Sequence, residues 1–236
     1  MVDRSDWVAG SLLSFLTPKE QEHLIDRGTR RWFAEREVLM LHGDPSNHVL
    51  VLLFGWVRVS KASREDQEVL LALRGPGDVL GDLAALNGWA RTATVRAMDT
   101  KALVVQLTRE QFVASLHEHP AIAIAMVKQM GTRLREAESV RVDFATLDVT
   151  HRVAAYLIWL SEQHGKPGHD GIVLDMPLTQ QDIASRVSAS LRAVARSMAL
   201  LRKREIVRTQ RRQVVIMRPD ALHAFHPSMP NDTEGL

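Results

Sequence analysis

Two arginines, Arg192 and Arg196, lie four residues apart in a stretch with helical periodicity. At this spacing both side chains project from one face of a helix, one turn apart. An arginine near the start of such a helix can donate two hydrogen bonds to the N7 and O6 edge of guanine, whereas one further along more often contacts phosphate. The pair therefore predicts DNA contact, with Arg192 reading bases and Arg196 contacting bases or phosphate.

Positive charge is concentrated around this pair. Residues 178–218 hold ten Lys/Arg and two acidic residues, a balance of +8, whereas the whole chain sums to only +2. The remainder must therefore sum to about −6, and a segregated basic end points to a polyanion, most often nucleic acid. The alternative is a solvated, charge-rich helical face. The coincidence of the basic stretch with a helix-turn-helix pattern favours DNA.

Two helix starts define that pattern. Thr179 and Asp182 have the spacing of a capping box, and Ser190 can cap a second helix after a short break of small residues. In the second helix a stripe at i, i+4 and i+7 is expected to be buried; it comprises Val194, Met198 and Leu201. Free N–H groups at helix starts attract phosphate. Gln180, Gln181 and Ser190 are therefore candidate phosphate contacts, or they are simply caps.

A β-hairpin is expected after the second helix. Two short β-rich runs, residues 205–209 and 213–217, flank the polar residues 210–212. This places Arg211 and Arg212 at the tip of a wing. The full predicted set of DNA contacts is Gln180, Gln181, Ser190, Arg192, Ala193, Arg196, Arg211 and Arg212.

A second chemical site is expected around Arg91 and Thr92, which follow a glycine-containing loop in residues 77–90. A guanidinium and a hydroxyl beside exposed loop amides make a competent anion site. Trp89, in the same segment, either covers the pocket or packs in the core.

Composition excludes several classes of protein. Cysteine is absent, which excludes disulfides, thiolate zinc sites and cysteine-held iron–sulfur clusters. No apolar run reaches membrane-spanning length and the first residues lack a signal-peptide core, so a cytoplasmic protein without membrane contact is expected. We find no nucleotide-hydrolysing loop, nucleophile elbow or zinc-protease motif, and therefore predict no enzymatic activity.

Histidines offer weaker alternatives. The run His117–Glu118–His119 could form a metal pair, but an exposed cluster at a helix start is the preferred interpretation, and we predict no metal site. A haem ligand among the ten histidines is conceivable, although no residue is singled out.

The elements that position these sites predict an α+β fold. A short helix begins at Pro18 with Thr17 as its cap, and short strands separated by turn signals follow over residues 28–107, as in a sandwich or barrel. The strands are expected at residues 38–41, 48–54, 56–59, 69–73, 94–97 and 102–107.

A long helix is expected over residues 120–145. Its heptad-spaced stripe comprises Ala123, Val127, Met130, Leu134, Ala137, Arg141 and Phe144. This stripe predicts a parallel homodimer, which would present two recognition helices to two half-sites. The alternative is one amphipathic helix packed on its own barrel. A fresh cap at Asp148 then begins another helix that ends near Gly165.

The order of small helix, Arg91–Thr92–Ala93, strand, long helix and C-terminal helix-turn-helix resembles the cyclic-AMP receptor protein and FNR (CRP/FNR) family of bacterial transcription regulators. The resemblance covers nearly the whole chain. It implies an N-terminal β-roll barrel like that of cyclic-nucleotide-binding proteins, a long dimerisation helix and a C-terminal winged helix-turn-helix. The implied domains are residues 1–116, 117–147 and 148–226, followed by a flexible tail over 227–236.

The resemblance also implies an effector site. Arg91 would bind a cyclic phosphate with Thr92 adding a hydroxyl, Gly81 would allow close backbone approach, Asp82 would accept from the ribose 2′-hydroxyl, and Arg133 would lie near the phosphate. The full implied set is Gly81, Asp82, Leu83, Arg91, Thr92, Ala93 and Arg133.

The chain departs from the family at three places in this pattern. Asp82 stands where members that bind cyclic nucleotides usually have Glu, Ala137 and Glu138 stand where the receptor protein has hydroxyl residues, and Leu191–Arg192 replaces an Arg-Glu pair. The operator is therefore expected to differ. The expected effector is cyclic AMP, another cyclic nucleotide or a different small molecule, and the alternative is that the site binds none.

The resulting functional hypothesis is a dimeric DNA-binding transcription regulator whose β-roll senses a small effector. Its expected partners are a double-stranded operator, its own copy and RNA polymerase. The alternative is a cyclic-nucleotide-binding regulatory module that acts on a protein partner.

Overall fold

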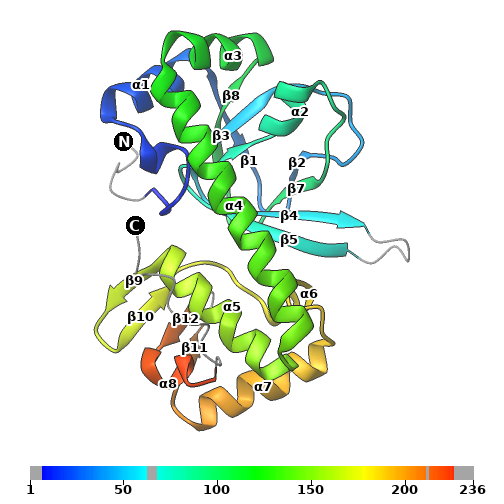
Figure 1. Ribbon diagram of the computed structural model, residues 1–236, viewed down its shortest axis with the longest axis vertical. Coiled ribbons are helices and arrows are strands. Elements are labelled where there is room, and N and C mark those ends of the chain that lie inside the picture. Colours follow the sequence, from blue (N-terminus) through cyan, green and yellow to red (C-terminus); the bar gives the residue numbers. More distant parts are fainter. Residues whose placement is uncertain (1–6, 63–67, 211–212, 226–236) are drawn as a thin grey trace. The chain divides into compact units, whose positions relative to one another are not determined.

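The computed structural model describes residues 7–62, 68–210 and 213–225, and the chain divides into two compact units, Met1–Glu136 and Ala137–Leu236 (Figure 1). Within the described residues, no helix has the length and apolar character needed to cross a membrane. The predicted tail over 227–236 lies outside the described residues.

Two four-stranded antiparallel sheets form the β-roll of the first unit. One has the order β1 (Thr29–Phe33), β8 (Ala102–Leu107), β3 (Val49–Phe54) and β6 (Val79–Leu80). The other has the order β2 (Val38–Met40), β7 (Thr94–Ala97), β4 (Val57–Ala62) and β5 (Glu68–Arg74).

Strand β3 shows how the core is built. Its first five residues are all buried, because successive side chains alternate between two apolar layers. Val49, Val51 and Leu53 pack with helical residues such as Phe112, whereas Leu50 and Leu52 belong to a separate cluster with residues of β2, β7 and β8. A strand buried on both faces reads as a continuous apolar run rather than as an alternating one.

Helices of the first unit complete the outer layer. They are the 3₁₀ turn η2 (Leu13–Phe15), α1 (Pro18–Arg27), α2 (Asp82–Asn87), α3 (Arg109–Glu118) and, as far as Glu136, α4 (Pro120–Thr146). Helix α1 begins at the predicted Thr17 cap, which forms a capping box in which Thr17 N donates to Glu20 Oε2 at 2.8 Å. Helix α3 begins with a second capping box, in which Gln111 N donates to Thr108 Oγ1 at 3.2 Å.

Helix α4 has two distinct faces. One face is buried within its own unit and comprises Ile122, Ala125, Met126, Gln129 and Glu136. The other carries the heptad stripe, on which the side chain of Val127 is 69% exposed and that of Leu134 is 60% exposed. The helix therefore packs on its own β-roll and still presents a second apolar face.

The second unit combines four helices and one sheet. The helices are α5 (Val149–His164), α6 (Gln180–Arg186), α7 (Leu191–Lys203) and α8 (Pro219–His223). The antiparallel sheet has the order β11 (Val207–Gln210), β12 (Gln213–Ile216), β10 (Gly171–Leu174) and β9 (Gly165–Gly168). Asp148 caps α5 as predicted, because its side chain accepts from His151 N.

The α+β fold is confirmed, and so are the six predicted strands and the wing hairpin, to within a few residues at their ends. The elements that were not predicted are β1, β6, β9, β10, η2, α3 and α8. The division between the two compact units falls within α4, and the predicted division into functional domains stays a prediction.

Candidate DNA-binding and effector sites

The helix-turn-helix comprises α6 and α7. In the cap of α6, Asp182 N donates to Thr179 Oγ1 at 3.1 Å, and Thr179 N donates to Asp182 Oδ2 at 3.0 Å. Ser190 Oγ accepts from Ala193 N at 3.2 Å and so caps α7. Both caps were predicted, and they satisfy N–H groups that the helices themselves leave without partners.

Helix α7 buries one face and exposes the other. The predicted stripe of Val194, Met198 and Leu201 is buried. Arg192 and Arg196 are exposed, and their side chains make no hydrogen bond or ion pair with any residue that the structure describes. The two guanidinium groups therefore keep all their donors available for a ligand.

The other predicted DNA contacts that the structure describes are at least partly accessible. Gln181 and Ser190 are exposed, and Gln180 and Ala193 are partly buried. The tip residues Arg211 and Arg212 lie outside the described residues.

Two basic residues of the charged stretch have structural contacts that the sequence did not reveal. Arg186 is buried, with its guanidinium 5.4 Å from the centre of the Tyr156 ring, and Arg208 Nη2 donates to Asp170 Oδ2 at 2.5 Å. Their partners are distant in the sequence, so the count of positive charges overstates the charge available to a polyanion.

The effector segment folds around Gly81, which has a φ of 77° and is the N-cap of α2. A side chain at this position would be strained in the left-handed region, and its Cβ would clash with Arg91 Nη1 and with Met40. Glycine therefore allows Arg91 to approach this turn of the backbone closely.

Arg91 is a buried cation with neutral partners. Its Nε donates to Ser46 Oγ at 3.1 Å, Nη1 to the carbonyl of Gly81 at 3.1 Å, and Nη2 to the carbonyl of His48 at 2.6 Å. Burial lowers the pKa of Arg91, and the charges of Asp44 and Asp82 only partly oppose this effect. No carboxylate among the described residues forms an ion pair with Arg91, and one N–H on each Nη atom remains for a ligand. Such a site favours an anion.

Asp82 and Arg133 form an ion pair with each other. Arg133 Nη1 lies 3.2 Å from Asp82 Oδ2, and Arg133 Nη2 donates to the carbonyl of Val79 at 2.5 Å and lies 3.6 Å from Asp78 Oδ1. Gln129 also donates to Asp78 Oδ1, at 2.8 Å. Side chains of α4 therefore hold the acidic residues on either side of Gly81.

Other members of the predicted effector set lie at the surface of this segment. Thr92 and Leu83 are exposed, and Ala93 is partly buried. Trp89 is exposed as well, which makes core packing the wrong interpretation for that residue.

Comparison with known proteins defines the class. The family profile for a cyclic nucleotide-binding domain matches residues 30–119, and that for a Crp-like helix-turn-helix domain matches residues 151–225. The chain is 26% identical over 191 residues to the global nitrogen regulator of Nostoc sp., covering 80% of this chain and 86% of that protein. It is 25% identical over 184 residues to the CRP-like cAMP-activated global transcriptional regulator of Mycobacterium tuberculosis, covering 78% of this chain and 82% of that protein.

Solved structures of similar proteins have the same fold. A CRP-family transcriptional regulator from Thermus thermophilus has a TM-score of 0.69 at 25% identity, over 84% of this chain and 97% of that one. The structure of FixK2 from Bradyrhizobium japonicum has a TM-score of 0.73, over 86% of this chain and 98% of that one. At 20% identity this similarity supports the fold alone.

A sensing β-roll joined to a helix-turn-helix unit defines a ligand-responsive transcription regulator. The chain belongs to the CRP/FNR family, and it is a DNA-binding transcription regulator that senses an effector.

Proposed function

We propose that this regulator acts as a homodimer that binds a two-fold symmetric operator through α7, under the control of an anionic effector in the β-roll. The observation that carries the proposal is the exposed pair Arg192 and Arg196, on a capped helix whose opposite face is buried. The helix-turn-helix match favours this function over a regulatory module that acts only on a protein partner.

In the proposed complex the start of α7 enters the major groove. Arg192 reads a guanine edge, Ala193 lies close enough to the bases for apolar contact, and Arg196 contacts a base or phosphate. Gln180, Gln181 and Ser190 lie at helix starts suited to phosphate. Arg211 and Arg212 would contact the backbone from the wing, which stays a prediction because they lie outside the described residues.

A second copy of the chain is the proposed partner of the exposed face of α4. The buried face already packs on the β-roll, so packing within the chain does not account for the exposed Val127 and Leu134. A stripe of this spacing pairs with its own copy in a coiled coil. Pairing would place two recognition helices on one duplex.

The proposed effector carries a phosphate or a similar anionic group. A buried guanidinium with spare donors, next to the exposed hydroxyl of Thr92, supports this chemistry. Cyclic AMP is the first candidate, because the M. tuberculosis relative is described as cAMP-activated. Asp82 already accepts from Arg133, and Ala137 and Glu138 offer no hydroxyl. We therefore propose phosphate recognition without assigning specificity for adenine.

The effector is proposed to act on DNA binding by favouring one of two arrangements of the dimer. Arg133 and Gln129 connect α4 to the acidic residues beside Gly81, so a ligand at that turn changes the contacts of α4 directly. Control of transcription further implies contact with RNA polymerase, which we include as a proposed partner.

Selection of duplexes from a random pool tests the DNA proposal. We expect enrichment of a palindrome whose half-sites lie about one helical turn apart, and an affinity that falls steeply with salt. The proposal fails if no duplex is enriched at low salt, with or without cyclic nucleotides.

Calorimetric titration with cyclic AMP, cyclic GMP and cyclic dinucleotides tests the effector site. Replacing Arg91 by alanine removes a charge-assisted contact and should weaken binding about 10- to 100-fold. Thr92→Ala should weaken it about 2- to 10-fold, and its exposed position makes the fold tolerant of the change.

Arg96→Ala is the matched control, because Arg96 lies on the adjacent strand β7 and donates to the carbonyl of Arg36. This variant should bind as the wild type does. A wild-type heat signal that persists unchanged in both Arg91→Ala and Thr92→Ala would refute the anchor.

A further inference from the structure

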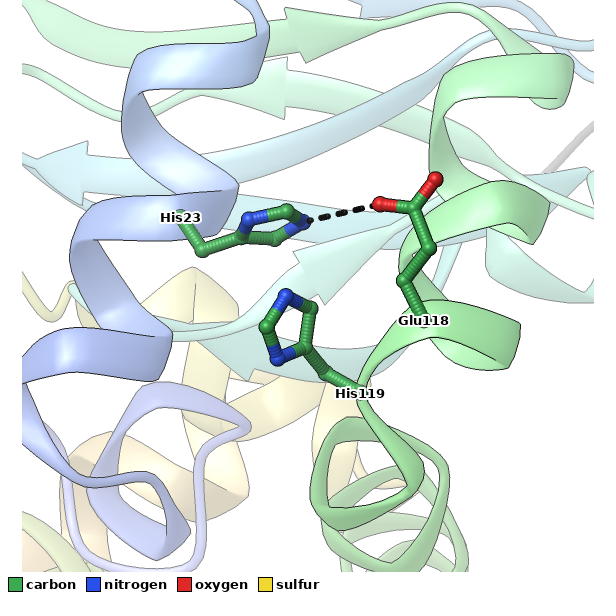
Figure 2. Close-up of side chains that lie close together, drawn as sticks. All are labelled: His23, Glu118 and His119. Carbon is green, nitrogen blue, oxygen red and sulfur yellow. Dashed lines mark ion pairs between the residues drawn. The ribbon is translucent and has the colours of Figure 1, made fainter.

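Three side chains with metal-binding donors meet in the first unit, away from the effector segment. His23 comes from α1, Glu118 is the last residue of α3, and His119 precedes α4 (Figure 2). One donor atom from each residue lies within 4.8 Å of the other two. Figure 2 marks the ion pair between His23 Nε2 and Glu118 Oε2, which lie 3.8 Å apart.

We propose that His23, Glu118 and His119 bind a divalent transition-metal ion, with zinc as the first candidate. Two imidazoles and one carboxylate are a donor set that suits zinc, and water can complete a four-coordinate site. Glu118 and His119 are neighbours in the sequence, and His23 joins them because α1 packs against α3.

The carboxylate of Glu118 is paired with the guanidinium of Arg27. Arg27 donates to both oxygens of Glu118, at 3.0 Å from Nη2 to Oε1, and its Nη1 lies 3.1 Å from His23 Nε2. Because a guanidinium can only donate, His23 must present the lone pair of Nε2 to it. His23 Nε2 is therefore in the form that a metal ion needs.

The protonation state of His23 agrees with this geometry. Burial lowers the pKa of His23, with further lowering from His119 and Arg27 and an opposing effect of Glu118. A lowered pKa favours the neutral imidazole, although the contact with Arg27 is what places the Nε2 lone pair in the cluster. A metal ion would replace Arg27 at Glu118, and the Arg27 side chain is partly exposed and free to turn toward solvent.

The required movement is small. Ligands about 2.1 Å from a tetrahedral zinc ion lie about 3.4 Å from one another, so donors that lie within 4.8 Å must approach by at most about 1.4 Å. Rotation of partly exposed side chains can supply this. A bound ion would then link α1 to the junction of α3 and α4.

The sequence pointed to only part of this cluster. His117, Glu118 and His119 were the candidate metal residues, but the cluster contains His23 in place of the exposed His117. His117 therefore provides a matched control: a neighbouring histidine outside the cluster.

Competition with a chromophoric zinc chelator, using the full chain without a histidine tag, tests the proposal. We expect one zinc ion per chain, and His23→Ala and His119→Ala should each weaken binding at least about tenfold. His117→Ala should bind zinc as the wild type does. Arg27→Ala should bind about two- to fivefold more tightly, because the competing ion pair is gone.

The tighter zinc binding expected of Arg27→Ala is a gain that a misfolded variant would not show. Circular dichroism verifies the fold of each variant. Cobalt gives a second readout, since the visible absorption of the tetrahedral ion should vanish in His23→Ala. Failure of both wild type and Arg27→Ala to bind micromolar zinc would overturn the proposal. Equal losses in His117→Ala and His23→Ala, or no loss in His23→Ala and His119→Ala, would overturn it as well.

Discussion

Replacing Arg192 and Arg196 together by alanine is expected to abolish operator binding at physiological salt. A bidentate arginine–guanine pair contributes about 1–3 kcal/mol of discrimination. A dimer loses two such pairs, so specific affinity should fall roughly 30- to 20,000-fold. Loss of two phosphate contacts from Arg196 should also reduce the slope of log affinity against log salt by about 2. Binding isotherms at several salt concentrations, on the selected operator and on a scrambled duplex, measure both effects.

Two controls separate base reading from charge. Arg30→Ala with Arg135→Ala removes the same charge from exposed positions outside α7 and should leave affinity nearly unchanged. Arg192→Lys keeps the charge but lacks the planar fork, so it should lower affinity for the operator more than for the scrambled duplex. Equal losses on both duplexes would show that Arg192 contacts only phosphate.

The substitutions should not disturb the fold, because both side chains are exposed and make no hydrogen bond or ion pair with the described residues. An unchanged melting temperature would verify this. Retention of full operator affinity by the double variant would contradict the assignment of α7 as the recognition helix.

Local signals predicted the DNA-binding unit well. The Thr179–Asp182 capping box, the Ser190 cap and the stripe beginning at Val194 each depend on residues within one or two turns, and all three are present. The strands at Thr94–Ala97 and Ala102–Leu107 were predicted to the residue for the same reason. Apolar runs bounded by turn residues need no knowledge of distant contacts.

The missed elements are those whose local signals conflict with their structure. Strand β1 exposes its first four residues, and only Phe33 is buried, so it lacks an alternating pattern. Strand β9 has the sequence Gly-Lys-Pro-Gly, which is typical of a turn. It is a strand because it pairs with β10, a contact that the local sequence does not reveal. Helix α3 has a local signal in the sequence, because Thr108 and Gln111 have the spacing of a capping box.

In the candidate sites, too, single residues could be predicted from local sequence, but their partners from distant segments could not. Arg91 was recognised by its place beside a glycine loop, but its acceptors Ser46 and His48 come from a distant segment. The pairing of Asp82 with Arg133, and the presence of His23 in the metal cluster, likewise depend on how far-apart segments meet. Sequence spacing predicts which residues share a helix face, and only the fold determines which faces meet.

Replacing Val127 and Leu134 together by glutamate is expected to convert the dimer to a monomer. Both side chains are exposed in the single chain, so the protomer should fold with little change in melting temperature. Across a coiled-coil seam the same positions would bury four carboxylates close to one another, which is strongly unfavourable. Sedimentation equilibrium should show the mass of one chain at micromolar concentration.

Operator binding should fall with the dimer. Two linked recognition units bind their second half-site at high effective concentration, and losing that linkage costs about 10²- to 10⁴-fold in affinity. Ala121→Glu with Ser139→Glu is the matched control, because it adds the same charge at exposed positions of α4 outside the heptad stripe. A control that also dissociates would show that net charge, rather than the stripe, governs assembly. If the wild type is a monomer, α4 packs only on its own β-roll. The prediction that Val127 and Leu134 pair with a second copy is then wrong.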